Sequence, residues 1–565
     1  MNWTQGYDPL HVWQLSTLIA ALPVMVLFYL LAVRGTKPHW AAMWGAMTAI
    51  LCASVVFTMP WGMSAMSFLF GAAFGLKIAW IVVAAVFLYD IAVETGQFEI
   101  MKDSVAAISQ DRRLQALIVA FAFGAFIEGC AGFGAPVAIS GAFMIGLGFE
   151  PFYAAVLNLI ANTAPVAWGS IGTPIHTLAA VSGLPESDLN AMLGRILPFT
   201  GVIIPFWLVR VMVPWRQTFE VLPAILVCGL SFSITQFFWS NYVDSNLVDI
   251  ASAVVCLVAM VIFLRFWRPA TIWRFRHDEE TKAEHTAKNY SRGAILKAWM
   301  PFLILSVFVL LWGLPSIKNG LNRATTPSFE VRSPDGKLRP GPPGWDVPAL
   351  HGHVFRDKPV VKEAAPEAAR YDFNWLTMTG TACFFAAIIS GLLLGVSPAK
   401  LLRLFIGTIK RMRFAVLAIA CMLGLGYVTR YSGMDAVLGL AFTRTGLLFP
   451  FFGTFLGWLG VALTGSDTAS NALFGSLQRI TAEQLHIDPI LMGAANSAGG
   501  VMGKMIDAQS IVVATAATGQ VGNEGKLLRR LVWHSIVLTA IIGVIVLLYA
   551  YVFQAAVPHG LTHVK

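Results

Sequence analysis

Runs of about 20 apolar residues recur along this chain from one end to the other, and they restrict the folds open to it. A helix of that length crosses the hydrocarbon core of a bilayer, where backbone polar groups must be satisfied within the protein. Only 12% of the 565 residues are charged and the mean hydropathy is +0.70, whereas soluble domains carry roughly twice that charged fraction. The sequence therefore predicts an all-α polytopic membrane protein with roughly 12–14 membrane segments.

The composition requires no partner other than the lipid bilayer. A formal charge of +9 is the excess of Lys and Arg expected of cytoplasmic loops, so no nucleic-acid partner is expected. The six cysteines lie in apolar segments without metal-type spacing, and we expect small core residues, no metal and no cofactor. The N-terminus is too polar before Leu15 for a cleavable signal peptide, so the first apolar run is expected to remain as a membrane helix.

Basic segments predict the orientation in the membrane. They are expected to form loops, at residues 34–37, 102–113, 210–216, 265–297, 400–413 and 526–530. The apolar runs allow all six to face one side, which the excess of Lys and Arg assigns to the cytoplasm. Both termini are then expected outside the inner membrane, on the periplasmic side. Residues 316–371 fall on that side too, and their Pro, Gly and charge content is typical of an exposed linker or partly disordered loop.

Two polar, glycine-rich segments recur in the two halves of the chain. Residues 162–169 (NTAPVAWG) match 496–503 (NSAGGVMG), and each follows a helix-breaking segment, 128–136 or 464–472. Gly129 precedes Asn162 by 33 residues, and Gly465 precedes Asn496 by 31. Because the preceding spans start from opposite sides, this order predicts inverted-topology repeats, an architecture of secondary transporters. A chance match between Gly- and Ala-rich membrane segments is the alternative.

These patterns divide the chain into six parts. They are N-terminal membrane helices at 1–66, a first inverted repeat at 67–216, connecting helices with a basic cytoplasmic loop at 217–315, the polar periplasmic loop at 316–371, a second inverted repeat at 372–530 and a C-terminal helix at 531–565.

The helix-breaking segments are expected to form the tips of two re-entrant hairpins. Their glycines are Gly129, Gly132, Gly134 and Gly465. Non-helical backbone survives in a membrane only where it is buried in protein or lines a wet cavity. Backbone N–H groups and a helix N-terminus at such a tip attract an anion, typically a carboxylate. Ser466, Thr468 and Asn471 add short side-chain donors, although small residues also permit close helix packing without any binding role.

The asparagine motifs are expected at the unwound midpoints of two broken helices. Asn162 and Asn496 could satisfy backbone groups freed at the breaks, or they could donate to a substrate. Thr163 and Ser497, beside them, offer hydroxyl groups of similar reach. The sequence does not separate these two roles.

Charged residues within or beside the repeated segments indicate function most directly. They are Glu128, Asp467, Lys504 and Asp507. An ionised side chain at mid-membrane costs about 2.5–3.5 kcal/mol on insertion scales, so each requires pairing or a role. We expect Lys504 to be the counter-charge of a carboxylate substrate, and Glu128, Asp467 and Asp507 to be candidates for proton coupling. The alternative is a structural salt bridge of Lys504 with Asp467 or Asp507.

At these residues the chain closely resembles the L-lactate permease family of bacterial secondary transporters. The motifs that carry the resemblance are 128–139 (EGCAGFGAPVAI), 162–166 (NTAPV), 456–460 (LGWLG), 464–474 (TGSDTASNALF) and 499–505 (GGVMGKM). The resemblance covers nearly the whole chain except residues 316–371. It implies proton-coupled import of L-lactate, with D-lactate and glycolate as related substrates, by a monomer or homodimer. The chain departs from the family pattern at Asp507 and Ala508, where Ser-Pro is usual, and this leaves the substrate range open.

Several rival functions remain at this point. Another small carboxylate, including a dicarboxylate, could be the substrate, and sodium could replace the proton because unwound carbonyls bind Na⁺. An enzyme is not expected, because the chain has no zinc-type His-Glu-x-x-His motif, nucleotide-binding loop or nucleophile elbow. A channel is excluded if uptake is saturable and driven by a gradient.

Overall fold

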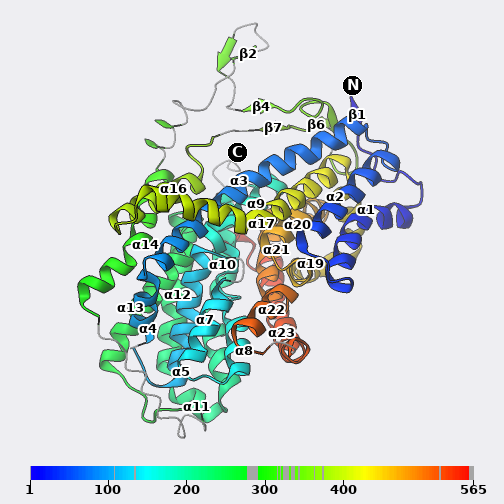
Figure 1. Cartoon of the computed structure of the whole chain (residues 1–565). Coiled ribbons are helices and arrows are strands. Elements are labelled where there is room, and N and C mark those ends of the chain that lie inside the picture. Colours follow the sequence, from blue (N-terminus) through cyan, green and yellow to red (C-terminus); the bar gives the residue numbers. More distant parts are fainter. Residues whose placement is uncertain are drawn as a thin grey trace.

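Helices form almost all of the computed structural model, which describes residues 2–106, 108–132, 135–275, 290–314, 316–317, 320–321, 330–332, 338–340, 344–361, 363–371, 374–520 and 523–558 (Figure 1). The first part of the chain contains β1 (Trp3–Thr4), α1 (Trp13–Phe28), the π-helix η1 (Tyr29–Val33), α2 (Pro38–Val55), α3 (Trp61–Glu94), α4 (Gln97–Ala106), α5 (Arg112–Gln115), the π-helix η2 (Ala116–Phe123), α6 (Gly124–Cys130), α7 (Ala135–Gly146), α8 (Pro151–Ala161), the 3₁₀-helix η3 (Val166–Trp168), α9 (Gly169–Ser182), α10 (Glu186–Met212), α11 (Trp215–Glu220), α12 (Leu222–Tyr242), α13 (Val248–Phe266) and α14 (Arg292–Gly313).

Short strands precede the helices of the second part. It contains β2 (Glu330–Arg332), β3 (Leu338–Pro340), β4 (Trp345–Asp346), β5 (Val354–Arg356), β6 (Ala365–Pro366), β7 (Arg370–Tyr371), α16 (Thr379–Leu393), α17 (Pro398–Ser432), α18 (Met434–Phe442), the 3₁₀-helix η5 (Thr443–Leu448), α19 (Phe449–Thr464), α20 (Asp467–Gln484), α21 (Pro489–Gly503), α22 (Ala508–Ala517), α23 (Glu524–Tyr551) and the 3₁₀-helix η6 (Gln554–Ala556).

The structure contains many membrane-spanning helices, as expected of a polytopic protein. Among the described residues, 10 helices are long and apolar enough to span a bilayer, or up to 11 if the bent pair α8 and α9 is one span. Two shorter apolar helices, Pro136–Gly146 and Thr379–Leu393, add further apolar segments. The helix leading to the first break covers Arg112–Cys130, which is long enough to cross a membrane by itself. The re-entrant character of that hairpin therefore stays a prediction.

The two halves contain the same order of elements. α3 and α17 are long helices that end beside glycines with positive φ, Gly96 at 72° and Gly433 at 81°. A short helix (α4 or α18), a helix leading to a break (η2 with α6, or α19) and a helix leaving it (α7 or α20) then follow. The pairs α8–α9 and α21–α22 come next, before the long helices α10 and α23. The opposite orientation of the two copies in a membrane stays a prediction.

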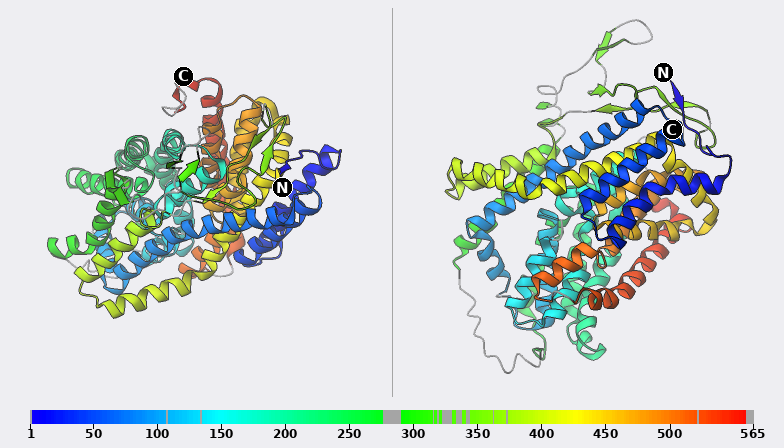
Figure 2. Two further views of the ribbon diagram at one scale, coloured as in Figure 1. Left: turned by 90° about the horizontal axis from the view of Figure 1, so that it is seen from above. Right: turned by 45° about the vertical axis from the view of Figure 1, so that its right-hand side comes forward.

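Helices α3 and α17 run side by side because glycines let their backbones approach closely (Figures 1 and 2). A Cβ at Gly71 would lie 2.4 Å from the Leu423 carbonyl oxygen, and one at Gly75 would lie 2.7 Å from Ala420 Cα. Small residues four apart serve this purpose in packed membrane helices. This close contact therefore joins the long helices α3 and α17 of the two halves.

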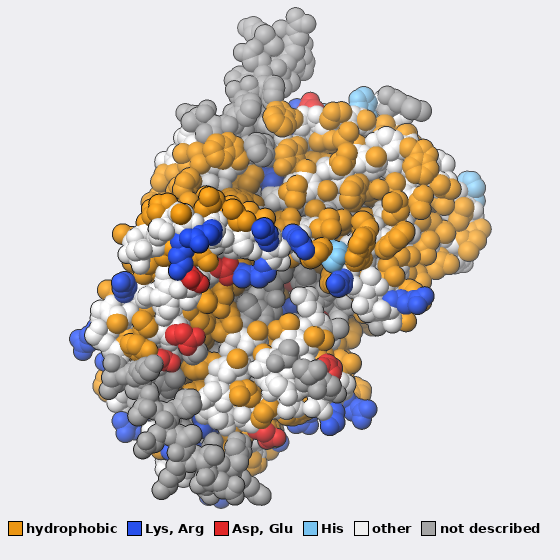
Figure 3. Space-filling model, in the orientation of Figure 1, with side chains coloured by type: hydrophobic (Ala, Val, Ile, Leu, Met, Phe, Trp, Pro, Cys, Tyr) orange, Lys and Arg blue, Asp and Glu red, His pale blue; other side chains and the backbone are white. Residues whose placement is uncertain are grey.

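The surface has the character expected of a membrane protein. Large apolar side chains of α1, α2 and α17 are exposed, and Figure 3 shows hydrophobic side chains covering the upper right of that face. Residues 403, 410, 411 and 413 of α17 are exposed Lys or Arg, and basic side chains gather in a band across the same face. These residues were expected in a loop at 400–413. They are helical because Ser397 caps α17, Pro398 starts it, and nothing between Lys400 and Arg413 interrupts it.

The polar segment after α14 is not a free linker in its described part. β5 pairs in parallel with the N-terminal strand β1, which places Trp3 opposite Val354, and β6 pairs with β5. Tyr7 adds a contact between the two segments, since its hydroxyl accepts from the Asp357 N–H at 3.3 Å and donates to Gln5 Oε1 at 3.0 Å. Burial raises the pKa of Tyr7 to about 12, so the phenol stays a donor at neutral pH. The N-terminus and residues 344–371 therefore hold one another, which corrects the expectation of an exposed linker.

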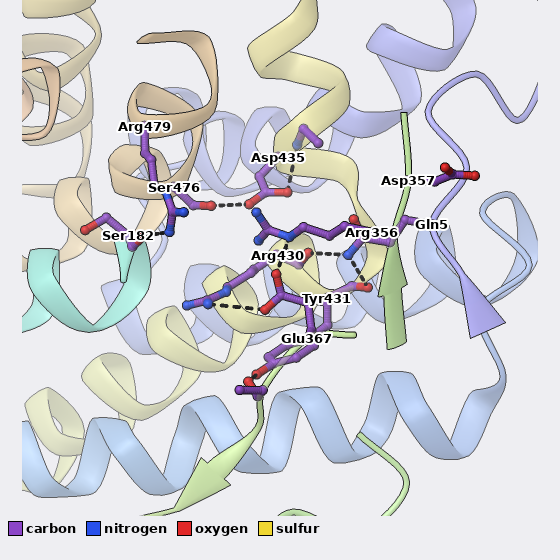
Figure 4. A network of polar contacts seen from close by, with 12 residues as sticks. Gln5, Ser182, Arg356, Asp357, Glu367, Arg430, Tyr431, Asp435, Ser476 and Arg479 are labelled. Carbon is purple, nitrogen blue, oxygen red and sulfur yellow. Dashed lines mark hydrogen bonds and ion pairs between the residues drawn. The ribbon is translucent and has the colours of Figure 1, made fainter. Parts of the chain in front are cut away.

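Glu367 attaches this polar segment to the membrane helices (Figure 4). Glu367 forms ion pairs with Arg356 and with Arg430 of α17. Arg430 also donates to the carbonyl oxygens of Ala180 and Val181, at 3.2 and 3.1 Å, in the last turn of α9. The start of α9 lies at the cavity described below, so Arg430 connects the polar segment to a helix of the candidate site.

We expect Glu367→Gln to detach the polar segment from α17. Arg356 and Arg430 would lose an anionic partner that is only 12% exposed, at a cost of about 1–3 kcal/mol. Limited proteolysis should cleave residues 344–371 faster, and the melting temperature in detergent should fall. Glu363→Gln, at an exposed position of the same segment, is the matched control. Equal cleavage rates in the two variants would contradict this role of Glu367.

Candidate functional site

A cavity lies where the two helix breaks meet. Its volume is about 230 Å³. Its walls come from both halves of the chain and are formed by Pro38, His39, Glu128, Gly132, Val166, Gly169, Ser170, Thr173, Pro174, Phe414, Ala415, Ala418, Ile419, Met422, Leu423, Thr464, Gly465, Ser466, Asp467, Thr468, Ala469, Ala472, Lys504 and Gln509. The sequence-predicted residues that line it are Glu128, Gly132, Gly465, Ser466, Asp467, Thr468 and Lys504.

The first break follows α6. Gly132 has a φ of 62°, a conformation that favours glycine, and it turns the chain between α6 and α7. Glu128, in the last turn of α6, is 3% exposed and faces the start of α9. A Cβ at Gly169 would lie 2.6 Å from Glu128 Oε1, so only glycine leaves room for the carboxyl group there.

Helix α9 is itself interrupted at the cavity. Ser170, Ile171 and Gly172 have φ values of 49°, 58° and 71°. Two non-glycine residues in this conformation are strained, and such strain concentrates at functional sites. Ser170 Oγ donates to the Ala131 carbonyl oxygen at 3.1 Å, which ties the interruption to the first break. Ser170 and Thr173 both line the cavity.

The second break lies between α19 and α20. Gly465 has a φ of 74°, and Ser466 caps α20 by accepting from the Ala469 N–H at 3.3 Å. Asp467 and Thr468 are the first residues of α20 and line the cavity. The N-terminus of a long buried helix therefore points its unsatisfied N–H groups towards the space where the sequence predicted an anion.

Asp467 is held by side chains that approach from behind the cavity. Its Oδ2 accepts from Ser497 Oγ and, at 3.3 Å, from Asn471 Nδ2. Its Oδ1 is buried and has no hydrogen-bond partner among the described residues. Gly500 gives this oxygen space, because a Cβ there would lie 2.3 Å from it. The carboxyl group is thus fixed in position with one oxygen unengaged.

Lys504 brings a positive charge to the cavity. It is 4% exposed and is the only Lys or Arg among the described lining residues. Its Nζ donates to the Gly465 carbonyl oxygen at 2.6 Å and lies 3.5 Å from Asp507 Oδ2. Asp507 does not line the cavity, and its Oδ1 caps α22 by accepting from the Ser510 N–H at 2.7 Å. Of the two alternative salt bridges considered above, the structure contains the one with Asp507.

The interruption expected at Asn496, in the C-terminal half, lies eight residues further along the chain. Asn496 and Ser497 lie inside α21, which continues to Gly503, and the chain turns at residues 504–507 instead. The glycines after Asn496 serve close packing on α19, since a Cβ at Gly499 would lie 1.9 Å from the Thr454 carbonyl oxygen. The prediction of an unwound helix at Asn496 is therefore wrong, although an interruption does precede α22.

In the N-terminal half the chain does bend at the asparagine motif. α8 ends at Ala161, and the pair α8–α9 is bent by 62° across residues 162–165. Neither Asn162 nor Thr163 lines the cavity, and Thr163 Oγ1 donates to the Ile160 carbonyl oxygen at 2.7 Å. Asn162 lies beside Glu128.

The other predicted residues lie behind the cavity. Asn496 Nδ2 donates to Asn471 Oδ1 at 2.9 Å, and Gln478 Nε2 donates to Asn496 Oδ1 at 3.2 Å. Together with Ser497 they form a buried network that supports Asp467. Gly129 packs against the start of α13, and Gly134 lies outside the described residues.

Some lining residues carry little signal in the sequence. The segment 169–174 (GSIGTP) combines two glycines with a proline, so a break at Ser170 could have been found. His39 stacks on Phe414 with ring centroids 4.5 Å apart, in a contact between positions far apart in the chain. Nothing local to His39 or Gln509 indicates that either lines a cavity.

Comparison with known proteins now identifies the family. The family model for L-lactate permease matches residues 16–553. The chain is 45% identical to the glycolate permease GlcA of Escherichia coli (strain K12), covering 98% of this chain and 99% of that protein. It is 44% identical to the L-lactate permease of Salmonella typhimurium (98% and 100% covered) and 42% identical to that of Bacillus subtilis (99% and 100% covered). The chain therefore belongs to the L-lactate permease family, and it is a multi-pass membrane transporter rather than an enzyme.

Proposed function

We propose that this protein imports L-lactate, and also D-lactate and glycolate, by proton symport across the bacterial inner membrane. The observation that carries the proposal is one cavity whose described lining residues include two buried acidic residues, Glu128 and Asp467, and a single lysine, Lys504. The names of the relatives support the substrate class, since they are L-lactate permeases and a glycolate permease.

The substrate carboxylate would lie between Lys504 and the start of α20. There Ser466 and Thr468 offer hydroxyl groups, and the helix N-terminus offers backbone N–H groups. Lys504 Nζ already binds the Gly465 carbonyl oxygen, so it is oriented towards this position before substrate arrives. On the other side of the cavity, the hydroxyl oxygens of Ser170 and Thr173 would accept a hydrogen bond from the hydroxyl group of a 2-hydroxy acid.

The proton would travel on Asp467 or Glu128. Both carboxyl groups are buried at the cavity, where a charge is costly unless it is paired. A proton and a lactate anion together form a neutral load, which reduces the cost of moving the anion through a low-dielectric path. Asn471, Asn496 and Ser497 would hold Asp467 in position, Asp507 would balance Lys504, and Asn162 with Thr163 would shape the bend beside Glu128.

The wider architecture follows the same proposal. The two halves, 67–216 and 372–530, would be inverted repeats that each supply one break to the cavity. The termini and the polar segment would lie on the periplasmic side, and the basic residues of α17 on the cytoplasmic side.

Uptake into proteoliposomes tests the coupling ion. With an interior one pH unit more alkaline, electroneutral symport of one proton should accumulate labelled lactate to about tenfold. A protonophore should abolish the accumulation, and an equal sodium gradient without a pH difference should drive none. Liposomes without protein are the control. Accumulation that follows the sodium gradient would replace the proton with sodium, and uptake that never exceeds the external concentration would make the protein a facilitator.

A further inference from the structure

A second buried carboxyl group lies behind the first break. Asp249 is in the first turn of α13 and is 0% exposed. The backbone of α6 covers it, since a Cβ at Gly129 would lie 2.9 Å from Asp249 Cβ. Neither carboxyl oxygen of Asp249 has a hydrogen-bond partner among the described residues. Asp249 does not line the cavity, and Gly129, which packs against it, directly follows the cavity residue Glu128 in the chain.

The surroundings of Asp249 leave two protonation states accessible. A buried carboxylate without a hydrogen bond or a cation is strongly disfavoured relative to the neutral acid. The N-terminus of α13 acts in the other direction, because its unsatisfied N–H groups favour a negative charge. The titratable groups of α6 beside this contact are Glu128 and Cys130, which flank Gly129. A group balanced in this way can gain and lose a proton without rearranging a salt bridge.

Glu128 directly precedes Gly129, which packs against Asp249, so the two buried carboxyl groups are neighbours that face different surroundings. Glu128 reaches the cavity, where Lys504 and Asp507 also act on it, whereas Asp249 reaches only the protein interior. Two neighbouring buried carboxyl groups resist simultaneous ionisation, so the pair binds its protons as one unit.

We propose that Asp249 and Glu128 form a coupled pair that holds the transported proton, with Glu128 exchanging it with the cavity and Asp249 retaining it in the protein interior. This inference rests on the proposed proton symport. It makes Asp249 a proton-holding residue that does not contact substrate. Loss of Asp249 should therefore impair coupling to the pH gradient and spare substrate binding.

The test compares Asp249→Asn with the wild type in two assays. Asparagine keeps the size of the side chain but cannot ionise. Lactate accumulation driven by a pH gradient should fall at least tenfold, while exchange of labelled for unlabelled lactate at equal pH should stay within twofold. Asp249→Glu should restore accumulation with a shifted pH profile. Glu150→Gln, an exposed carboxyl group with no capping hydrogen bond, should change neither assay.

Each outcome decides the matter. Unchanged accumulation in Asp249→Asn would overturn the proposal, and so would equal loss of accumulation and exchange in a variant with a normal melting temperature. If Asp249→Asn does not fold, Asp249→Glu becomes the test, and a wild-type pH profile there would overturn it. Infrared difference spectra add a direct measurement, since the C=O stretching band of a protonated carboxyl group should disappear in Asp249→Asn. If the wild type itself ignores the pH gradient, the proposed symport fails instead.

Discussion

Lys504→Met is expected to raise the half-saturation concentration for lactate by about ten- to a hundredfold in the exchange assay. Lys504 supplies the only Lys or Arg side chain among the described residues of the cavity wall. A hydrogen bond to a charged group contributes about 1.5–3 kcal/mol, and each 1.4 kcal/mol changes an affinity tenfold. Methionine keeps most of the side-chain length, so the variant removes the charge with little change in packing.

A second effect of Lys504→Met has to be separated from the first. Asp507 is 0% exposed and would lose its cation, which destabilises the protein whether or not substrate binds Lys504. The double variant Lys504→Met with Asp507→Asn removes that unpaired charge. We expect the double variant to regain stability and still bind lactate weakly. Lys526→Met, at an exposed position of α23, is the control for a lost positive charge. Recovery of normal affinity in the double variant would remove Lys504 from the substrate site.

Much of the site could be predicted because helix breaks in a membrane have strong local signatures. Gly465 and Ser466 combine a left-handed turn with a helix cap, and both lie where the sequence placed them. The charges Glu128, Asp467 and Lys504 were conspicuous in apolar surroundings, and all three line one cavity. Local chemistry therefore located the parts, and the structure brought them together.

The errors arose where one composition serves two purposes. Glycine, alanine and serine around Asn496 suggested an unwound helix, yet the same small residues allow α21 to pack tightly on α19. The basic residues at 400–413 suggested a loop, although Lys and Arg are good helix formers and α17 runs through them. Asp249 and His39 depend on contacts between distant helices, which no local pattern encodes.

Gly499→Ala is expected to destabilise the protein by about 3 kcal/mol or more, because it forces two helix backbones apart. The added Cβ would lie 1.9 Å from the Thr454 carbonyl oxygen and 2.8 Å from its carbon, and a helix backbone cannot yield as a side chain can. Gly457→Ala should have a similar effect on the opposite side of the same contact, where the Cβ would lie 1.8 Å from the Asn496 carbonyl oxygen.

The matched control is Gly525→Ala, in α23, where no atom lies within 4 Å of the added Cβ. That variant should gain up to about 1 kcal/mol, since alanine is the better helix former. Thermal unfolding in detergent, followed by size-exclusion chromatography, measures the stability of all three variants.

The Gly499 and Gly457 variants have a functional consequence as well, because the α19–α21 contact fixes Lys504, at the end of α21, relative to Gly465, at the end of α19. If the melting temperature of Gly499→Ala equalled that of Gly525→Ala, the glycines of this motif would not be required for packing. A role in unwinding α21 during transport would then be the better explanation of their presence.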